Sequence, residues 1–263
     1  MCCARRASRK SASALILKAP RRLSNKIPPL ALLSGGLALR LRPRTLKVPK
    51  AMLEVAGEPF IAHQLRLMRR ECVPRVVLCV GYLGEQIEAF VKDGSQFGVE
   101  VAYCYDGATL LGTGGALRKA LPLLGPEFLV MYGDSWLDTA FAPIVAAYYT
   151  SGKSALMTVF HNEGRWDVSN VWYESGVIRC YDKVERVPQM RYIDWGLSLI
   201  KAETLAQQPA EIAFDLAAIY SGLARVGELA GYELEKRFYE IGSADGLRDT
   251  DALLRGTSPF ARG

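Results

Sequence analysis

From Pro28 onward, short apolar runs alternate with amphipathic segments, and this alternation constrains the fold more than any other feature of the chain. Strands are expected at 31–33, 75–80, 99–105 and 127–132. Helices are expected at 59–70 and 83–92, and a third helix is expected to begin in the glycine-rich turn at 110–115 and to end at 124. Strands that alternate with helices are typical of βαβ units. The sequence therefore predicts an α/β fold with a mixed, mostly parallel sheet flanked by helices.

The second half of the chain has a different sequence pattern, with short β-like runs in place of alternating strands and helices. Short β-like runs at 155–160, 170–173, 177–181 and 193–200 are separated by polar turns, and a helix is expected at 214–226. The chain then continues through FYEIG at 238–242 into a final helix at 244–254. We expect this half to form a small β-rich extension that borders a cleft.

Charge is distributed unevenly between a leader and the rest of the chain. The formal net charge is +6, but residues 1–27 hold eight basic residues and no acid, so the remainder carries about −2. We therefore divide the chain into a basic leader (1–28), a domain (29–255) and a tail (256–263). The leader is interpreted as a disordered extension or misassigned start, with a transit peptide or a basic arm as alternatives. The domain itself gives little support to nucleic-acid binding.

The apolar runs and the cysteines argue against membrane-spanning, zinc-binding and disulfide-rich proteins. No apolar run approaches the roughly 18 residues of a membrane helix. The six cysteines form no C-x-x-C pair, which argues against a zinc site or a disulfide framework. We expect a cytoplasmic protein without a membrane span.

A glycine-containing basic loop follows the first expected strand. Leu33, Ser34, Gly35 and Gly36 lead into Arg40, and Lys50 closes the segment, which also holds three further basic residues and no acid. Glycines let backbone N–H groups approach an anion, while arginine and lysine neutralise phosphate oxygens. This combination suits a triphosphate, although a lone glycine pair followed by arginines also occurs in ordinary loops.

Asp134 follows the expected strand at 127–132. In open α/β sheets, ligands bind beyond the carboxyl ends of the strands, where a carboxylate can bind Mg²⁺. The alternative is a turn cap formed with Gly133 and Ser135. The basic loop at the same edge of the sheet favours the metal.

Six segments in order resemble the sugar-1-phosphate nucleotidyltransferase family. They are LLSGGLALRLRPRTLKVPKAM, LLGTGGALRKAL, YGDSWL, YDK, IDWGL and FYEIGS, and the likeness covers about residues 30–254. The chain looks most similar to short members such as mannose- or heptose-1-phosphate guanylyltransferases and muramic-acid-phosphate uridylyltransferases. The resemblance implies a Rossmann-like, glycosyltransferase-A-like fold, in which the β-rich extension holds the acceptor.

The resemblance also implies roles for particular residues. Arg40 and Lys50 would be catalytic and hold phosphates, and Asp134 and Glu240 would bind Mg²⁺. Lys183 would contact the sugar phosphate and Asp194 a sugar hydroxyl. The nucleotide would contact one set of residues on two loops: Leu33, Ser34, Gly35, Gly36, Gly112, Thr113 and Gly114. The glycines of LGTGGAL could instead serve close packing.

The implied reaction joins an NTP to a sugar-1-phosphate and releases pyrophosphate. The attacking phosphate oxygen is already ionised, so orientation and charge neutralisation can supply most of the catalysis. Two residues depart from the family pattern, which usually has threonine at the position of Leu39 and aspartate at that of Glu240.

Several alternatives stay open at this level. A nucleotide-binding or regulatory subunit without catalysis would share the loop, and so would a phosphocholine cytidylyltransferase-like enzyme. GTP is preferred on overall motif similarity, but the base, the sugar and the oligomeric state, including a homo-oligomer, are not determined.

Overall fold

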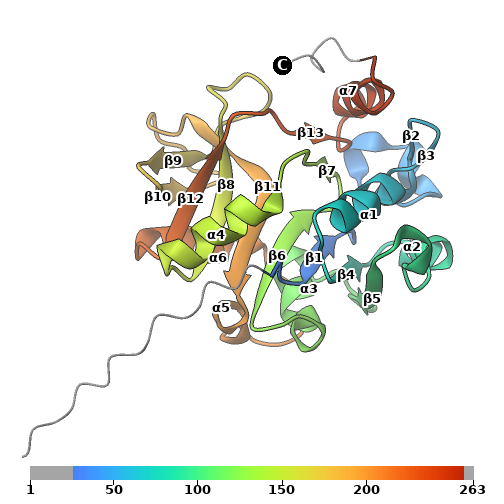
Figure 1. Cartoon of the computed structure of the whole chain (residues 1–263), viewed down its shortest axis with the longest axis horizontal. Coiled ribbons are helices and arrows are strands. Elements are labelled where there is room, and N and C mark those ends of the chain that lie inside the picture. The colour runs from blue at the N-terminus through green and yellow to red at the C-terminus, as the bar shows by residue number, and fades with distance from the viewer. Residues whose placement is uncertain (1–25, 258–263) are drawn as a thin grey trace, which may run out of the picture.

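The computed structural model describes residues 26–257 and is built on one nine-stranded sheet (Figure 1). The predicted leader lies almost entirely outside the described residues, as does the tail beyond Thr257. The strands of the sheet, in spatial order, are β5 (Glu100–Tyr105), β4 (Arg75–Val80), β1 (Leu30–Leu33), β6 (Glu127–Tyr132), β11 (Tyr192–Lys201), β8 (Ala155–His161), β12 (Leu229–Leu234), β10 (Val177–Tyr181) and β9 (Val171–Glu174).

The first four strands in this order run parallel. Leu30 of β1 pairs with Val76 of β4 on one side and with Leu129 of β6 on the other. All four strands therefore end at the same edge of the sheet, where ligands of open α/β folds bind.

The mixed sheet is less parallel than predicted, because antiparallel pairs dominate its second half. There β11 runs antiparallel to both β6 and β8, and β10 runs antiparallel to both β12 and β9, while β12 and β8 are parallel. The predicted mixed character is confirmed. However, the β-rich half does not form a separate extension, because β11 pairs directly with β6 and continues the same sheet.

Helices cover both faces of this sheet. One face packs against α1 (Phe60–Arg70), α2 (Gly84–Val91) and α4 (Phe141–Ser151), and the other packs against α3 (Gly112–Ala120), α5 (Ala202–Ala206) and α6 (Leu216–Arg225). Strand β1 shows why both faces are covered, since Leu30 and Leu32 join one core cluster and Ala31 joins the other. A strand buried on both faces is apolar throughout, as the sequence of β1 is.

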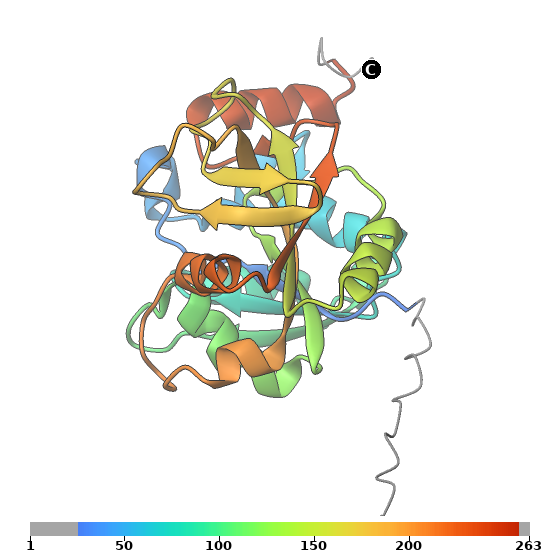
Figure 2. The same ribbon diagram turned by 90° about the vertical axis from the view of Figure 1, so that its left-hand side faces the viewer.

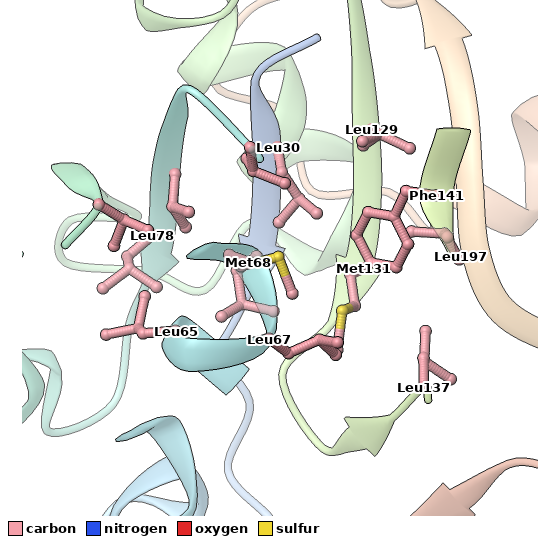
Figure 3. Close-up of a cluster of buried hydrophobic side chains, with 14 of the residues drawn as sticks. Leu30, Leu65, Leu67, Met68, Leu78, Leu129, Met131, Leu137, Phe141 and Leu197 are labelled. Atoms are coloured by element: carbon pink, nitrogen blue, oxygen red, sulfur yellow. The ribbon is translucent and has the colours of Figure 1, made fainter. Parts of the chain in front are cut away.

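The larger core cluster lies under α1 (Figure 3). Leu65 and Met68 of α1 point toward Leu30, Leu78 and neighbouring strand residues, and all of these side chains are fully buried. Each such side chain contributes about 1.5–3 kcal/mol relative to exposure. This packing fixes the strand ends beside the basic loop.

A smaller unit stands beyond the carboxyl edge of the sheet. Helix α7 (Ala244–Leu254) lies across one end of the molecule (Figure 2) and contacts the hairpin of β2 (Glu54–Val55) and β3 (Glu58–Pro59). Val55 of the hairpin, Phe60 of α1, and Ile241 and Leu247 form a small buried cluster there. The short pair of β7 (Ser135–Trp136) and β13 (Tyr239–Glu240) ties this unit to the end of β6. Within residues 26–257, no helix combines the length and apolar character needed to cross a membrane.

Candidate active site

A cavity of about 620 Å³ opens beyond the carboxyl end of β6. Five of the residues singled out in the sequence line it together: Arg40, Asp134, Lys183, Asp194 and Glu240. They come from positions spread over two hundred residues, and the fold brings them to one place.

Asp134, Glu240 and Arg40 meet around Gly242. A Cβ atom built on Gly242 would lie 2.8 Å from Glu240 Oε2 and 3.0 Å from both Asp134 Oδ2 and Arg40 Nη2. The pairing of β13 with β7 produces this convergence, because Glu240 is opposite Ser135 and the Ile241 N–H donates to the Asp134 carbonyl at 2.9 Å. Any side chain at position 242 would displace these charged groups.

Lys50 joins the same charge cluster. Its Nζ donates to Asp134 Oδ2 at 2.6 Å, and both side chains are about one-quarter exposed. Charge-assisted contacts of this length are stronger than neutral hydrogen bonds. The lysine therefore reaches the end of β6 from the basic loop.

Glu240 is held by the amino end of α7. Its carboxylate accepts the N–H groups of Gly242 and Ser243 and, at 2.5 Å, the Ser243 hydroxyl. Anions are stabilised at a helix N-terminus, and these three donors hold the carboxylate in one orientation.

The two carboxylates fit a magnesium ion by their chemistry. Mg²⁺ typically takes one or two protein carboxylates and completes its shell with phosphates and water. The described residues contain no group of three or more His, Cys, Asp or Glu side chains arranged for a metal. Asp134 and Glu240 would thus hold the ion only together with a phosphate ligand.

The glycine loop packs tightly against the ends of β4 and β6. The Ser34 N–H donates to the Cys79 carbonyl at 2.8 Å, and a Cβ on Gly133 would lie 2.4 Å from Ser34 Oγ. Among the described residues, Ser34 Oγ is buried without a hydrogen-bond partner. A buried hydroxyl of this kind usually has a partner, which makes it a candidate contact for a bound nucleotide. Open space surrounds the Cα of Gly36.

The second glycine motif lies in the first turn of α3. A Cβ on Gly114 would lie 2.1 Å from Phe214 Cε2, and one on Gly112, whose φ is +68°, would lie 2.7 Å from the Phe214 carbonyl oxygen. Thr113 Oγ1 donates to Asp215 Oδ1 at 3.0 Å. These glycines are required for packing against the segment before α6, and their contact with a nucleotide stays a prediction.

Asp194 lies where β11 becomes irregular. The pairing of β11 with β8 shifts between Asp194 and Ser198, and Gly196 in this stretch has φ of +101°. Asp194 accepts the Gly196 N–H at 2.9 Å and the hydroxyls of Tyr132 and Tyr181 at 3.4 and 3.5 Å. Burial raises the pKa of the Asp194 carboxyl despite these donors.

Lys183 stands at the outer side of the cavity. Its Nζ lies 3.4 Å from both carboxylate oxygens of Asp215, and its side chain is 40% exposed. Asp215 also caps α6 by accepting the Ala217 N–H at 2.8 Å. The Lys183 ammonium group is therefore positioned by Asp215 and remains accessible to a ligand.

Asp106 is a further candidate that the sequence reasoning missed. It follows β5 as Asp134 follows β6, and it is only 9% exposed. Its Oδ2 accepts the Leu111 N–H at 3.2 Å and lies at 3.2 and 3.5 Å from Cβ positions built on Gly81 and Gly35. Burial raises the pKa of this carboxyl. Asp106 follows the edge strand β5, so a rule that selects an acid after any parallel strand would have found it, whereas the rule used for Asp134 required a central strand.

Comparison with known proteins agrees with this geometry. Residues 31–169 match the family described as nucleotidyl transferase, which is more than half of the chain. The chain belongs to this family. The resemblance inferred from the sequence motifs is thereby confirmed.

Individual members of the nucleotidyl transferase family show how far the likeness extends. N-acetylmuramate alpha-1-phosphate uridylyltransferase of Neisseria meningitidis is 40% identical over 123 residues, which are 46% of this chain and 52% of that protein. Mannose-1-phosphate guanyltransferase beta-A of Xenopus laevis is 28% identical over 220 residues, which are 80% of this chain and 60% of that protein. This chain thus spans between one-half and two-thirds of the length of these relatives.

A solved structure supports the fold. HddC from Yersinia pseudotuberculosis, in complex with GMP-PN, has a TM-score of 0.73 against 87% of this chain and 100% of its own, with 17% sequence identity. The likeness shows that this chain shares its overall fold with that protein.

Proposed function

We propose that this protein transfers a nucleotidyl group from an NTP to a sugar-1-phosphate, giving an NDP-sugar and pyrophosphate. The observation that carries the proposal is the meeting of Arg40, Lys50, Asp134 and Glu240 at one end of a cavity whose other wall holds Lys183 and Asp194. Two cations and two carboxylates suit a metal-bound triphosphate. A cation and a hydrogen-bonding acid suit a phosphorylated sugar.

In this reaction an oxygen of the sugar phosphate bonds to the α-phosphorus, and the bond from that phosphorus to the pyrophosphate oxygen breaks. The attacking oxygen is ionised, so no proton has to be removed. Arg40 and Lys50 neutralise charge that gathers on the leaving pyrophosphate. Lys183 exchanges its contact with Asp215 for the incoming phosphate and so brings two anions together.

Asp134 and Glu240 would hold Mg²⁺ in this scheme. When bound, the ion polarises phosphoryl oxygens and offsets the charge of the triphosphate. Lys50, which contacts Asp134 here, would be placed to contact phosphate oxygens beside that carboxylate. The short Lys50–Asp134 contact keeps both groups in place before the substrates bind.

We propose GTP as the preferred nucleotide, because of Asp106. The order of the strands places β1 between β4 and β6, so a nucleotide whose phosphates lie near Asp134 extends its base toward the ends of β4 and β5. Guanine presents two adjacent N–H donors, which one carboxylate can accept together. Uracil presents one donor between two acceptors, which a carboxylate repels. The guanyltransferase relative is consistent with this choice, whereas the uridylyltransferase relative is not.

Pyrophosphate release tests the proposed function. Purified protein is incubated with Mg²⁺, each of GTP, UTP, CTP and dTTP, and a panel of sugar-1-phosphates, with Asp134→Asn as the inactive control and Asp138→Asn as the matched surface control. Turnover with at least one pair, lost in Asp134→Asn alone, supports the proposal. Nucleotide binding without turnover would favour a regulatory subunit, and CDP-choline formation from CTP and phosphocholine would favour a cytidylyltransferase. Either outcome contradicts the proposal.

A further inference from the structure

A stack of three side chains lies at the rim of the cavity. The Arg237 guanidinium carbon is 3.7 Å from the ring centre of Trp166 and 4.3 Å from that of Tyr239. Arg237 Nη2 also donates to Asp249 of α7 at 3.1 Å. Cation–π contacts at these distances are favourable, particularly when the cation is largely removed from water, as the 15% exposed Arg237 side chain is.

The stack brings the indole ring of Trp166 to the cavity. Trp166 lines the same cavity as Asp194 and Lys183 and is 41% exposed. Because Arg237 covers one face of the ring, the accessible area belongs to its other face and its edges. A flat apolar surface beside a cation and a hydrogen-bonding acid suits a pyranose phosphate, which carries a C–H face, hydroxyls and an anion.

The stack also connects this surface to the charge cluster. Tyr239 is the neighbour of Glu240 in β13, and β13 pairs with β7 directly after Asp134. Arg237 therefore links the loop that carries Trp166 to the strand and the helix that fix the Glu240 carboxylate. Displacement of the Arg237 guanidinium would loosen both the Trp166 loop and the elements that hold the Glu240 carboxylate.

We propose that Trp166 is the platform on which the acceptor sugar packs, and that Arg237 is a positioning residue that couples this platform to Glu240. This inference rests on the proposed function, since it assigns the acceptor of that reaction to one wall of the cavity. The chemical class that the platform accepts is a hexose-like ring with an exposed C–H face.

The platform is tested with Trp166→Leu and Trp166→Phe, with Trp172→Phe as a control on a tryptophan outside the cavity. Calorimetry measures binding of glucose 1-phosphate and mannose 1-phosphate, and initial rates give separate KM values for acceptor and NTP. We expect Trp166→Leu to weaken acceptor binding about tenfold with the NTP KM unchanged, and Trp166→Phe to retain most of the affinity. An acceptor affinity unchanged in Trp166→Leu, or binding of neither phosphate by the parent protein, would overturn the platform.

The coupling is tested with Arg237→Lys, which keeps the charge but loses the planar group that stacks. Arg75→Lys is the matched control, because Arg75 pairs with Glu100 at the far edge of the sheet. We expect Arg237→Lys to raise both the acceptor KM and the Mg²⁺ concentration for half-maximal rate by about threefold or more. A purely structural role would lower the melting temperature and leave both values unchanged, and that result would overturn the coupling.

The experiments separate a failure of the proposed reaction from a failure of the Trp166 platform. Acceptor binding that Trp166→Leu weakens, without turnover in the parent protein, would contradict the proposed reaction and support the platform. Turnover with the same acceptor KM in the parent protein and in Trp166→Leu would support the reaction and overturn the platform.

Discussion

Lys50 Nζ lies 2.6 Å from Asp134 Oδ2, although 84 residues separate the two positions. The contact joins the basic loop after β1 to the carboxyl end of β6. These are the two places where the sequence suggested phosphate binding and metal binding.

Removal of the Lys50 charge tests this relationship. We expect Lys50→Met to lower kcat about 10²- to 10³-fold, because a preorganised cation at developing phosphate charge contributes on that scale. Lys47→Met, an exposed lysine in the same loop, should keep the parent rate. Equal losses in the two variants would indicate a general effect of loop charge and would contradict a specific role for Lys50.

Base preference should depend on Asp106. An asparagine there offers one acceptor and one donor group, which match an imide edge better than the two donors of guanine. We expect Asp106→Asn to lower kcat/KM for GTP by roughly 10- to 100-fold, since a hydrogen bond to a charged group contributes about 1.5–3 kcal/mol. Activity with UTP should fall less or rise. The measurement is kcat/KM for both nucleotides, and an unchanged ratio would remove Asp106 from base recognition.

Stability should depend on pH through Asp194. Burial raises the pKa of this carboxyl in the folded state, whereas the unfolded chain has the ordinary value. The folded protein therefore binds the proton more tightly. Its stability is highest below the unfolded pKa and falls as pH rises through the raised folded pKa.

Asp194→Asn removes this titration. The variant should lose less stability than the parent between acidic and neutral pH, and it should be the more stable protein at neutral pH while losing acceptor affinity. Chemical unfolding at several pH values measures the difference, with exposed Asp138→Asn as control. Parallel pH profiles for parent and Asp194→Asn would refute the assignment.

Two glycines distinguish packing from ligand contact. Gly114→Ala places a methyl group 2.1 Å from the Phe214 ring, so we expect a loss of about 1–3 kcal/mol in the free energy of unfolding. Gly36→Ala meets no atom within 4 Å and should keep the parent stability, while raising the NTP KM. Phe214→Leu should restore part of the stability lost in Gly114→Ala. A stable Gly114→Ala protein with impaired nucleotide binding would reverse the two roles.

Local patterns were sufficient for most of the fold. The residues of β4, β6, β10 and α7 match the predicted ranges, because each segment has clear periodicity bounded by turn residues. Helix α4 was missed because its apolar residues are not confined to one face. Strand β12 was missed because Gly231 interrupts it. The structure requires that glycine, since a Cβ there would lie 2.5 Å from the Tyr173 ring.

The direction of the strands in the second half could not be predicted. It depends on which segments pair across long sequence distances, as β11 does with β6 and β8. Period-two alternation is the same in parallel and antiparallel strands, so the sequence indicated a mixed sheet but not which of its strands run antiparallel.

Several residues selected from the sequence lie in one cavity, but the sequence did not give their arrangement. Motif order brought Asp134 and Glu240 together as expected ligands of one ion. It did not indicate that α7 would hold the Glu240 carboxylate through Ser243, or that Gly242 would mark their meeting point. Asp106 and the Trp166 stack lie outside the family motifs, and only the structure places Trp166 in the cavity and Asp106 against Gly35 and Gly81.

The most direct test of the account is a crystal structure of the protein with Mg²⁺ and a non-hydrolysable GTP analogue. The account predicts a cation held by the Asp134 and Glu240 carboxylates, with triphosphate oxygens on that cation and on Lys50 and Arg40. A nucleotide bound elsewhere, or a cation that contacts neither carboxylate, would contradict it.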